Sequence, residues 1–293
     1  IYSGHDRETH KPVVISTWQS LYKLPKKFFK DYGVVFGDEA HLFKAKSLTS
    51  IMSKLHLCKY RFGLTGTLDD LQTHKLVLEG LFGTVNKVIS TKELIEKKTL
   101  ANLKIDSLIL GYKEQECKDV KNLKYADEMD YIVTHKKRLS FITNLLGNVK
   151  GNVLVLYQFV EKHGKPLYDT IKEKYKNRNV FFVSGSVDAL DREKIREISE
   201  KTNNAVIVAS YGTFSTGINI KNLHNIIFSS PSKSKIRVLQ SIGRGLRLND
   251  NKEMCKLFDI ADDLTYKGKQ NFTLRHFMER INIYNEEQFD YTI

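Results

Sequence analysis

The sequence predicts an α/β protein made of two parallel-sheet domains in tandem. Short runs of β-branched residues alternate with longer segments of helical period, and these runs fall into two blocks separated by a strongly charged stretch. This alternation is typical of parallel strands covered by helices. The chain has 293 residues, which is enough for two ordinary domains. We therefore expect two parallel sheets.

The position of each apolar run predicts one strand. In the first block the predicted strands are 12–17, 33–38 and 60–65, and in the second block they are 153–158, 180–184, 205–210, 225–229 and 256–260. Between the blocks we expect a strand over 105–110 and a helix over 127–146. The resulting parts are a first domain at 1–103, a connection with an entry helix at 104–147, a second domain at 148–262 and a C-terminal helical tail at 263–293.

The charge balance favours a polyanionic partner. Lys and Arg number 47 against 34 Asp and Glu, which gives a formal charge of +13 and suits a phosphate backbone. The three cysteines are too few and too scattered for a disulfide framework or a zinc pair, which fits a reducing cytoplasm. No apolar run approaches the roughly 20 residues of a membrane span, so we expect a soluble, cytoplasmic protein.

The stretch GVVFGDEAHLF at 33–43 ends an apolar strand in Asp38 and Glu39. Adjacent carboxylates repel each other and are costly at the edge of an apolar element unless a cation or hydrogen bonds compensate. A strand that ends in Asp-Glu is the Walker B arrangement, in which Asp holds Mg²⁺ and Glu polarises the water that attacks a γ-phosphate. The alternative is an exposed turn whose acids favour the start of a helix.

Further motifs follow in a fixed order. They are LTGT at 64–67, TFSTGIN at 213–219 and QSIGRGLR at 240–247. Together with DEAH at 38–41, this ordered set resembles motifs II, III, V and VI of the superfamily-two helicases. The stretches VVISTWQSL and VLVLYQFVEKHGKPL resemble motifs Ib and IV of the same family. The resemblance covers most of residues 12–262 and implies two RecA-like domains.

The resemblance gives residues of the first domain roles in an ATP site. Asp38 would bind Mg²⁺ through water and Glu39 would act as the general base. His41, Thr65 and Thr67 would couple the state of the nucleotide to movement between domains. A packed histidine and a simple turn after a strand are the alternatives for these last three residues.

In the second domain the resemblance assigns phosphate contacts to motif VI. Arg244 and Arg247 would reach the γ-phosphate, and Gln240 would position water or phosphate. Arginine suits this role because its charge is permanent and its fork matches phosphate oxygens. Being three residues apart, the two arginines can share one helix face, and helix-surface charge is the alternative. Gly217 and Asn219 would lie near the ribose or serve only a tight turn.

Two sets of residues are candidates for binding nucleic acid. Residues 11–30 contain lysines interleaved with aromatic residues and no acidic residue. Such a stretch allows phosphate contact together with base stacking. The alternative is a solvated lysine face with the aromatic residues in the core. The second set lies in motifs that line the nucleic-acid groove of the family. The candidates are Lys23, Lys26, Lys27, Thr17 and Gln19 in the first domain, and Thr213 and Ser215 in the second.

One element of the family is absent from this sequence. The Gly-Lys pairs at 164–165 and 268–269 lack the glycine spacing and the following residue of a phosphate-binding P-loop. Either the chain is the C-terminal portion of a longer motor, with its first domain incomplete at the N-terminus, or it binds nucleic acid without turnover. The retained Asp38, Glu39, Arg244 and Arg247 favour the longer motor.

The function implied by the resemblance is an ATP-dependent DNA helicase. Within superfamily two, the chain is most similar to phage recombination and repair helicases, which implies action on junctions, stalled forks and DNA–RNA hybrids. ATP and Mg²⁺ are the expected cofactors, and we expect a monomer. An annealing module without turnover and an RNA helicase are the alternatives, because DEAH is also motif II of many RNA helicases.

Overall fold

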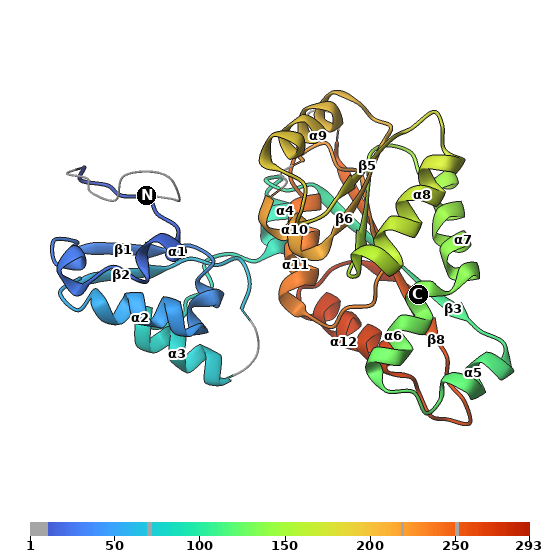
Figure 1. Cartoon of the computed structure of the whole chain (residues 1–293), viewed down its shortest axis with the longest axis horizontal. Coiled ribbons are helices and arrows are strands. Elements are labelled where there is room, and N and C mark those ends of the chain that lie inside the picture. The colour runs from blue at the N-terminus through green and yellow to red at the C-terminus, as the bar shows by residue number, and fades with distance from the viewer. Residues whose placement is uncertain (1–10, 69–71, 218–219, 250–251) are drawn as a thin grey trace. The chain divides into compact units, whose positions relative to one another are not determined.

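The computed structural model describes residues 11–68, 72–217, 220–249 and 252–293, without the side chains of residues 189 and 215–217 (Figure 1). The chain divides into two compact units, Ile1–Val88 and Ile89–Ile293. Both contain parallel strands with helices, as predicted. None of the helices in the described ranges is both long and apolar enough to cross a membrane.

The first unit is organised around two parallel strands. β1 (Val34–Gly37) and β2 (Tyr60–Gly63) pair in register, with Val34 opposite Tyr60 and Gly37 opposite Gly63. These strands confirm the predictions at 33–38 and 60–65. In Figure 1, α2 and α3 lie on one side of the two strands. The other elements of the unit are α1 (Trp18–Leu21), η1 (Lys26–Phe29), η2 (Ala40–Lys44), α2 (Lys46–Lys54) and α3 (Gln72–Phe82).

The strand predicted at 12–17 is wrong. Residues 12–17 have no regular secondary structure, and Val13 and Ile15 are 76% and 85% exposed. An alternating apolar run becomes a strand only where a neighbouring strand and a core face receive it. Among the described residues of the first unit, β1 and β2 pair only with each other.

The two faces of the β1–β2 pair differ in burial. One face belongs to a core in which Phe29, Leu48 and Met52 are buried and Val35 is partly buried. On the opposite face, apolar side chains from both strands are exposed, and the rings of Phe36 and Phe62 stack with centroids 5.1 Å apart. We call this surface the exposed strand face. It consists of Val34, Phe36, Tyr60 and Phe62.

The second unit contains a seven-stranded sheet of order β5-β6-β4-β7-β8-β3-β9, in which every described ladder is parallel. All five strands predicted for the second block are present. The strands are β3 (Asn102–Gly111), β4 (Val153–Tyr157), β5 (Asn179–Val183), β6 (Ala205–Ser210), β7 (Asn225–Phe228), β8 (Met254–Asp263) and β9 (Tyr291–Thr292).

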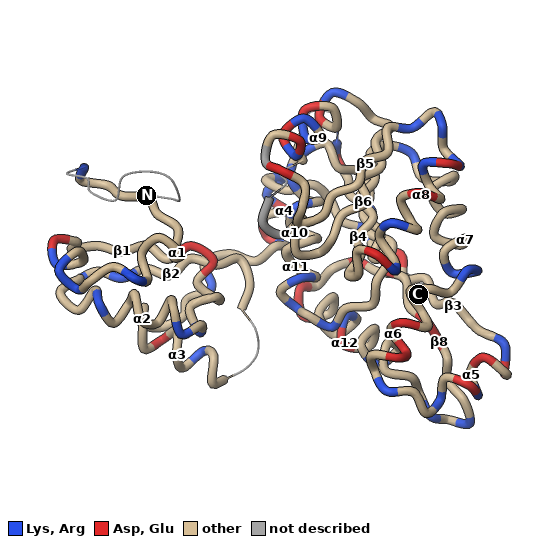
Figure 2. Tube along the Cα trace, in the orientation of Figure 1, with Lys and Arg blue, Asp and Glu red and all other residues tan. Residues whose placement is uncertain are grey.

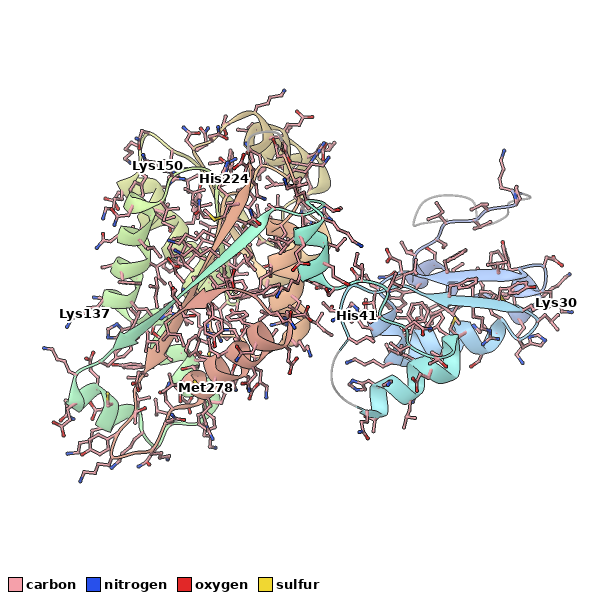
Figure 3. All side chains as sticks on the ribbon, turned by 180° about the vertical axis from the view of Figure 1, so that it is seen from behind. Lys30, His41, Lys137, Lys150, His224 and Met278 are labelled. Atoms are coloured by element: carbon pink, nitrogen blue, oxygen red, sulfur yellow. The ribbon has the colours of Figure 1, made fainter. Side chains whose placement is uncertain are left out.

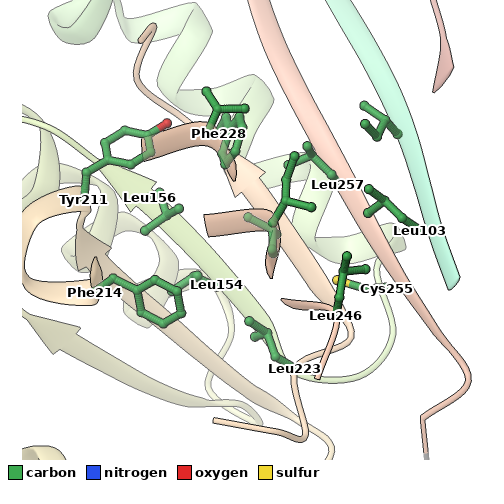
Figure 4. Close-up of a cluster of buried hydrophobic side chains, with 14 of the residues drawn as sticks. Leu103, Leu154, Leu156, Tyr211, Phe214, Leu223, Phe228, Leu246, Cys255 and Leu257 are labelled. Carbon is green, nitrogen blue, oxygen red and sulfur yellow. The ribbon is translucent and has the colours of Figure 1, made fainter. Parts of the chain in front are cut away.

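Helices cover both faces of this sheet. Along β4, Leu154 and Leu156 point into the cluster of Figure 4, which also receives side chains from α10, α11 and α12, whereas Val153 and Val155 pack with α7 and α8. The helical elements are α4 (Thr91–Glu96), α5 (Glu114–Val120), α6 (Tyr125–Thr134), α7 (Lys136–Leu145), η3 (Leu146–Asn148), η4 (Val160–Gly164), α8 (Lys165–Lys174), α9 (Ala189–Lys201), α10 (Tyr211–Gly217), α11 (Lys235–Gly245) and α12 (Phe272–Glu286).

The structure corrects the predicted connection at 104–147. The chain divides after Val88 rather than after residue 103, and Ile95 and Leu100 pack against the core of the second unit. β3 pairs along its whole length with β8 and is therefore part of the second sheet. The helix predicted at 127–146 is two helices, α6 and α7, interrupted at His135, whose backbone is extended (φ −70°, ψ 116°). The C-terminal tail also belongs to the second unit, since α12 contributes to its core and β9 extends its sheet.

Candidate functional site

Motifs II and III lie at the same edge of the first unit. Because β1 and β2 are parallel and in register, Asp38 and Leu64 leave their strands side by side. Two hydrogen bonds continue the pairing past the strand ends, from the Leu64 amide to the Gly37 carbonyl (2.8 Å) and from the Ala40 amide to the Leu64 carbonyl (2.8 Å). The sequence motifs are therefore neighbours in space, at the carboxyl end where parallel sheets bind ligands.

Two glycines allow this edge to pack closely. A Cβ on Gly37 would lie 2.8 Å from Phe43 Cζ, and one on Gly63 would lie 3.0 Å from ring atoms of Phe82. Phe43 and Phe82 meet edge to face with centroids 5.0 Å apart. The rings of η2 and α3 thus rest directly on the backbone that leads into the Asp38 turn.

Asp38 and Glu39 form a tight turn with accessible carboxylates. Glu39 has left-handed backbone angles (φ 49°, ψ 51°), which are uncommon outside glycine. Its amide donates to Asp38 Oδ1 at 2.9 Å. One carboxylate oxygen of Glu39 lies 3.3 Å from His41 Nδ1. The hydrogen bond to Asp38 and the imidazole beside Glu39 thus compensate part of the cost of two adjacent acids.

The three predicted coupling residues are linked by hydrogen bonds. His41 is buried and its Nδ1 lies 2.9 Å from the Thr65 hydroxyl. That hydroxyl donates to the Thr67 carbonyl at 2.8 Å, so it accepts from His41, which assigns the proton to Nδ1. The link joins motif II to motif III, although the sequence separates His41 from Thr65 by 24 residues.

The donor set at Asp38 fits a magnesium ion held mainly by water. In the described part of the chain, no group of three or more His, Cys, Asp or Glu side chains is arranged to hold a metal. Mg²⁺ in nucleotide sites usually takes one or two carboxylates and fills the remaining positions with water and substrate phosphates. The exposed Asp38 carboxylate is sufficient for that arrangement.

Motif VI occupies the end of α11 and the residues after it. Ser234 caps the helix by accepting from the Arg237 amide, and Gln240 and Arg244 lie in the last turns. The Arg244 guanidinium lies 5.4 Å from the ring centre of Phe214 on α10. The prediction that Arg244 and Arg247 share a helix face is wrong, because α11 ends at Gly245 and Arg247 follows the C-cap.

Gly245 explains why α11 ends so close to the sheet. A Cβ at this position would lie 2.5 Å from Ile226 Cδ1 of β7 and 2.8 Å from Cys255 Sγ of β8. Only a glycine lets the helix approach these strands at this distance, so the glycine between the two arginines is a packing requirement.

Buried arginines hold the loop between β7 and α11. Arg138 of α7 pairs with Asp262 (2.7 Å) and donates to the Ser229 carbonyl (2.7 Å). Arg280 of α12 pairs with Asp259 (2.8 Å) and donates to the Ser232 carbonyl (2.8 Å).

Two more side chains bind the centre of this loop. Tyr211 donates to the Ser230 carbonyl, and His163 lies 2.8 Å from the Ser230 hydroxyl. The loop that leads into motif VI is therefore fixed from both faces of the sheet. Sequence reasoning missed these residues, since single charges inside amphipathic helices resemble surface charge.

The motif V candidates are only partly described. Gly217 is the last residue of α10, Ser215 lies in the same helix without a described side chain, and Asn219 falls outside the described residues. Thr213 is 7% exposed, and its side chain accepts from the Ser210 hydroxyl at 2.8 Å. Its observed contact is local, within the start of α10.

The nucleic-acid candidates of the first unit are at its surface. Thr17 precedes α1, and both Thr17 and Gln19 are exposed. Lys23, Lys26 and Lys27 are exposed as well, whereas Phe29 is buried in the core. This arrangement supports the alternative of a lysine face above core aromatics.

Charge is distributed widely in this protein. Lys30 and His41 lie at opposite ends of the first unit in Figure 3, so this lysine is far from the motif II edge. Lysines and arginines occur along most elements of both units in Figure 2. Charge alone therefore does not define a nucleic-acid path.

Comparison with known proteins agrees with the fold and the motif geometry. Residues 137–249 match the family described as "Helicase conserved C-terminal domain", and residues 1–70 match "Type III restriction enzyme, res subunit". Together with the parallel sheets and the strand-end carboxylates, these matches agree with the resemblance of the motifs to those of the superfamily-two helicases.

Individual relatives extend this similarity over nearly the whole chain. The ATP-dependent DNA helicase uvsW of Enterobacteria phage T4 is 37% identical over 96% of this chain and 58% of its own length. The probable helicase D10 of Escherichia phage T5 is 26% identical over 93% of this chain and 57% of its own length. The crystal structure of T4 UvsW matches with a TM-score of 0.58 and 36% identity, covering 94% of this chain and 56% of that one. The chain thus spans a little over half the length of these relatives.

Proposed function

We propose that the full-length protein is an ATP-dependent DNA helicase or translocase that remodels branched DNA in recombination, repair and replication. The observation that carries the proposal is the 37% identity to a protein named as an ATP-dependent DNA helicase, along a chain whose motif II carboxylates lie at a strand-end edge. His41, bonded to Thr65, gives that edge a route by which a change at motif II reaches motif III.

The residue roles at the first unit follow from phosphoryl transfer, where placement and charge neutralisation dominate catalysis. Glu39 orients and deprotonates the attacking water. Asp38 holds Mg²⁺ through water. When bound, the ion neutralises charge on the phosphates. The left-handed turn at Glu39 sets the direction of its carboxylate.

In the second unit, Arg244 and Arg247 contact the γ-phosphate and stabilise the charge of the transition state. Gln240 positions water or phosphate one turn earlier on α11. Gly217 and Asn219 are assigned to the ribose by the family motif alone.

The nucleic acid is held through its backbone. Thr17, Gln19, Ser215 and the lysines at 23, 26 and 27 are proposed contacts, with Thr213 a weaker one because its side chain is buried. Phosphate contacts carry no sequence information, so binding is expected to be independent of sequence. Preference for junctions, forks and DNA–RNA hybrids rests on the resemblance to recombination helicases.

The location and the assembly state are also proposals. Cys58, Cys117 and Cys255 are free thiols, which suits a reducing cytoplasm, and the phage relatives point to that of a host cell. We propose that the protein acts as a monomer.

The decisive experiment measures ATP hydrolysis by the full-length protein with and without DNA. Hydrolysis stimulated by DNA supports a motor, whereas DNA binding or annealing without hydrolysis supports the rival module. Equal or greater stimulation by RNA would favour an RNA helicase. The 293-residue chain alone should hydrolyse no ATP, because its sequence contains no P-loop.

Branch preference needs a second assay. ATP-dependent unwinding of a four-way junction, a fork and an R-loop is compared with that of a blunt linear duplex of equal length at fixed salt. Equal activity on all four substrates would reject branch preference while leaving the motor assignment intact.

A further inference from the structure

Lys252 is a buried lysine beyond the end of α11. It is only 3% exposed, and its ammonium donates to the backbone carbonyls of Gly245, Arg247 (2.9 Å) and Lys221 (3.3 Å). An ammonium has three hydrogens, and each of them has an acceptor here. The Gly245 carbonyl belongs to the last turn of α11, where carbonyls lack a partner within the helix.

This ammonium joins two motif segments. Lys221 follows the motif V stretch, and Arg247 is the last residue of motif VI. Glu200, near the end of α9, bonds the same two segments through its carboxylate. It accepts from the amides of Lys221 and Asn222, the latter at 3.2 Å, and from Asn249 Nδ2 at 3.2 Å. The Gly245 carbonyl before Arg247, the Arg247 carbonyl and the Asn249 side chain after it are thereby tied to the segment after motif V.

The burial of Lys252 exceeds what helix termination needs. A glycine or an exposed basic side chain satisfies the last carbonyls of most helices. A buried ammonium loses its hydration, and burial lowers the pKa of Lys252, an effect that the Glu200 carboxylate opposes. The hydrogen bonds to the three carbonyls offset part of this cost, and the same bonds hold the backbone of Gly245, Arg247 and Lys221 in one arrangement.

We propose that Lys252 is a positioning residue for Arg247, holding the Arg247 backbone against the segment after motif V so that the guanidinium is directed at the ATP phosphates. Arg247 lies past the C-cap, so α11 does not fix its direction. The proposal rests on the proposed role of Arg247 in ATP hydrolysis. Lys252 itself contacts no substrate.

The test is a double-mutant cycle in the full-length protein, with Lys252→Met, Arg247→Ala and the double variant. Lys252→Met keeps the length of the side chain and removes its three donors. DNA-stimulated kcat and the KM for ATP are measured for each form, with the melting temperature as a check on folding. Lys201→Met, the same change at an exposed position on α9, is the matched control.

If Lys252 acts through Arg247, Lys252→Met lowers kcat by about tenfold or more when Arg247 is present and by less than about twofold when it is absent. The KM for ATP changes little, and Lys201→Met has no effect. An equal loss of kcat in both backgrounds, or no loss in either, would overturn the inference. Full turnover by Arg247→Ala alone would instead reject the role proposed for Arg247 and this inference with it.

A second variant covers the case in which Lys252→Met fails to fold. Lys252→Arg keeps a cation and several donors, so it should fold and retain the hydrogen bonds in an altered geometry. Its kcat should fall in the presence of Arg247 while its melting temperature stays near that of the parent. Unchanged kcat in Lys252→Arg, with Lys252→Met unfolded, would mean that Lys252 serves folding alone.

Discussion

Glu39 is unusual both in its backbone conformation and in the position of its carboxylate. It holds a left-handed backbone conformation and presents a carboxylate beside His41. In the full-length protein, Glu39→Gln should keep ATP binding, because size and hydrogen bonding are preserved. Hydrolysis should fall by about a hundredfold to ten-thousandfold, since the base is lost. Nucleotide binding and DNA-stimulated turnover are measured in parallel.

The control for this prediction is Glu79→Gln, the same change on α3 of the same unit, which should leave turnover unchanged. Turnover close to that of the parent in Glu39→Gln would remove Glu39 from the base role.

His163 makes the stability of the second unit dependent on acid. Burial, and then the nearby Arg138 guanidinium, lower the pKa of His163 to about 3. The pKa of histidine in an unfolded chain is near 6.5, so below that pH the unfolded state binds a proton at this residue and the folded state does not. The contribution of His163 to the free energy of unfolding is therefore fully present above pH 6.5. As pH drops from about 6 toward 3, the free energy of unfolding falls by about 1.4 kcal/mol per pH unit.

The measurement is urea unfolding of the parent and His163→Gln between pH 7 and pH 4.5. Glutamine keeps a polar group facing Ser230 and does not titrate, so the difference in unfolding free energy between the two proteins should shrink or reverse as pH falls. A difference that stays constant across this range would contradict the assigned pKa.

At the scale of single residues, motif spacing predicted which chemical groups gather but not how they are held. The pattern located Asp38, Glu39 and Thr65, and parallel pairing brought them to one edge. Arg280 and Lys252 were missed because a lone basic residue in a polar segment is usually solvated. Their burial depends on carbonyls and carboxylates far away in sequence, and no local pattern records these partners.

Helix α12 is attached to the sheet by an ion pair. Arg280 is 1% exposed, pairs with Asp259 and donates to the Ser232 carbonyl, while Tyr284 donates to the same aspartate at 2.8 Å. Arg280→Met should destabilise the second unit by about 3–5 kcal/mol, because removing one partner leaves a buried carboxylate unpaired. Chemical denaturation with a spectroscopic readout gives this value.

The matched variant is Arg275→Met, on the exposed side of the same helix, where a loss of under about 1 kcal/mol is expected. Equal losses in the two variants would show that the ion pair contributes no more than surface packing.

The sequence predicted the positions of strongly periodic helices and strands well. It did not predict the residues at which these elements begin, end or are interrupted. The five strands of the second block were found because each is a mostly apolar run, and in β4, β6 and β7 that run is buried on both faces. The run at 12–17 is also rich in β-branched residues but lacks a described partner strand. The break at His135 has no proline or glycine to mark it; there the His135 ring bonds Glu116 at 2.9 Å instead.

The two units have separate cores and should unfold separately. The first core gathers around residues such as Met52, and the second contains larger clusters that include Leu167. Because stability grows with the apolar area buried, calorimetry of the 293-residue chain should resolve two transitions, the lower one from the first unit.

Two core truncations assign these transitions. Met52→Ala should move only the lower transition and Leu167→Ala only the upper one, each costing about 2–5 kcal/mol in its own unit. A single transition that both variants shift alike would mean that the units unfold as one.

The exposed strand face bears on the colloidal behaviour of the chain. Phe36 is 66% exposed and Phe62 is 46% exposed, and their stacked rings form one continuous apolar surface with Val34 and Tyr60. An exposed apolar surface on strands favours self-association of the chain. Light scattering from the 293-residue chain should rise with concentration, and the double variant Phe36→Ser/Phe62→Ser should remain monodisperse. Purification yield, shelf life and crystal quality would then depend on two aromatic rings that take no part in catalysis.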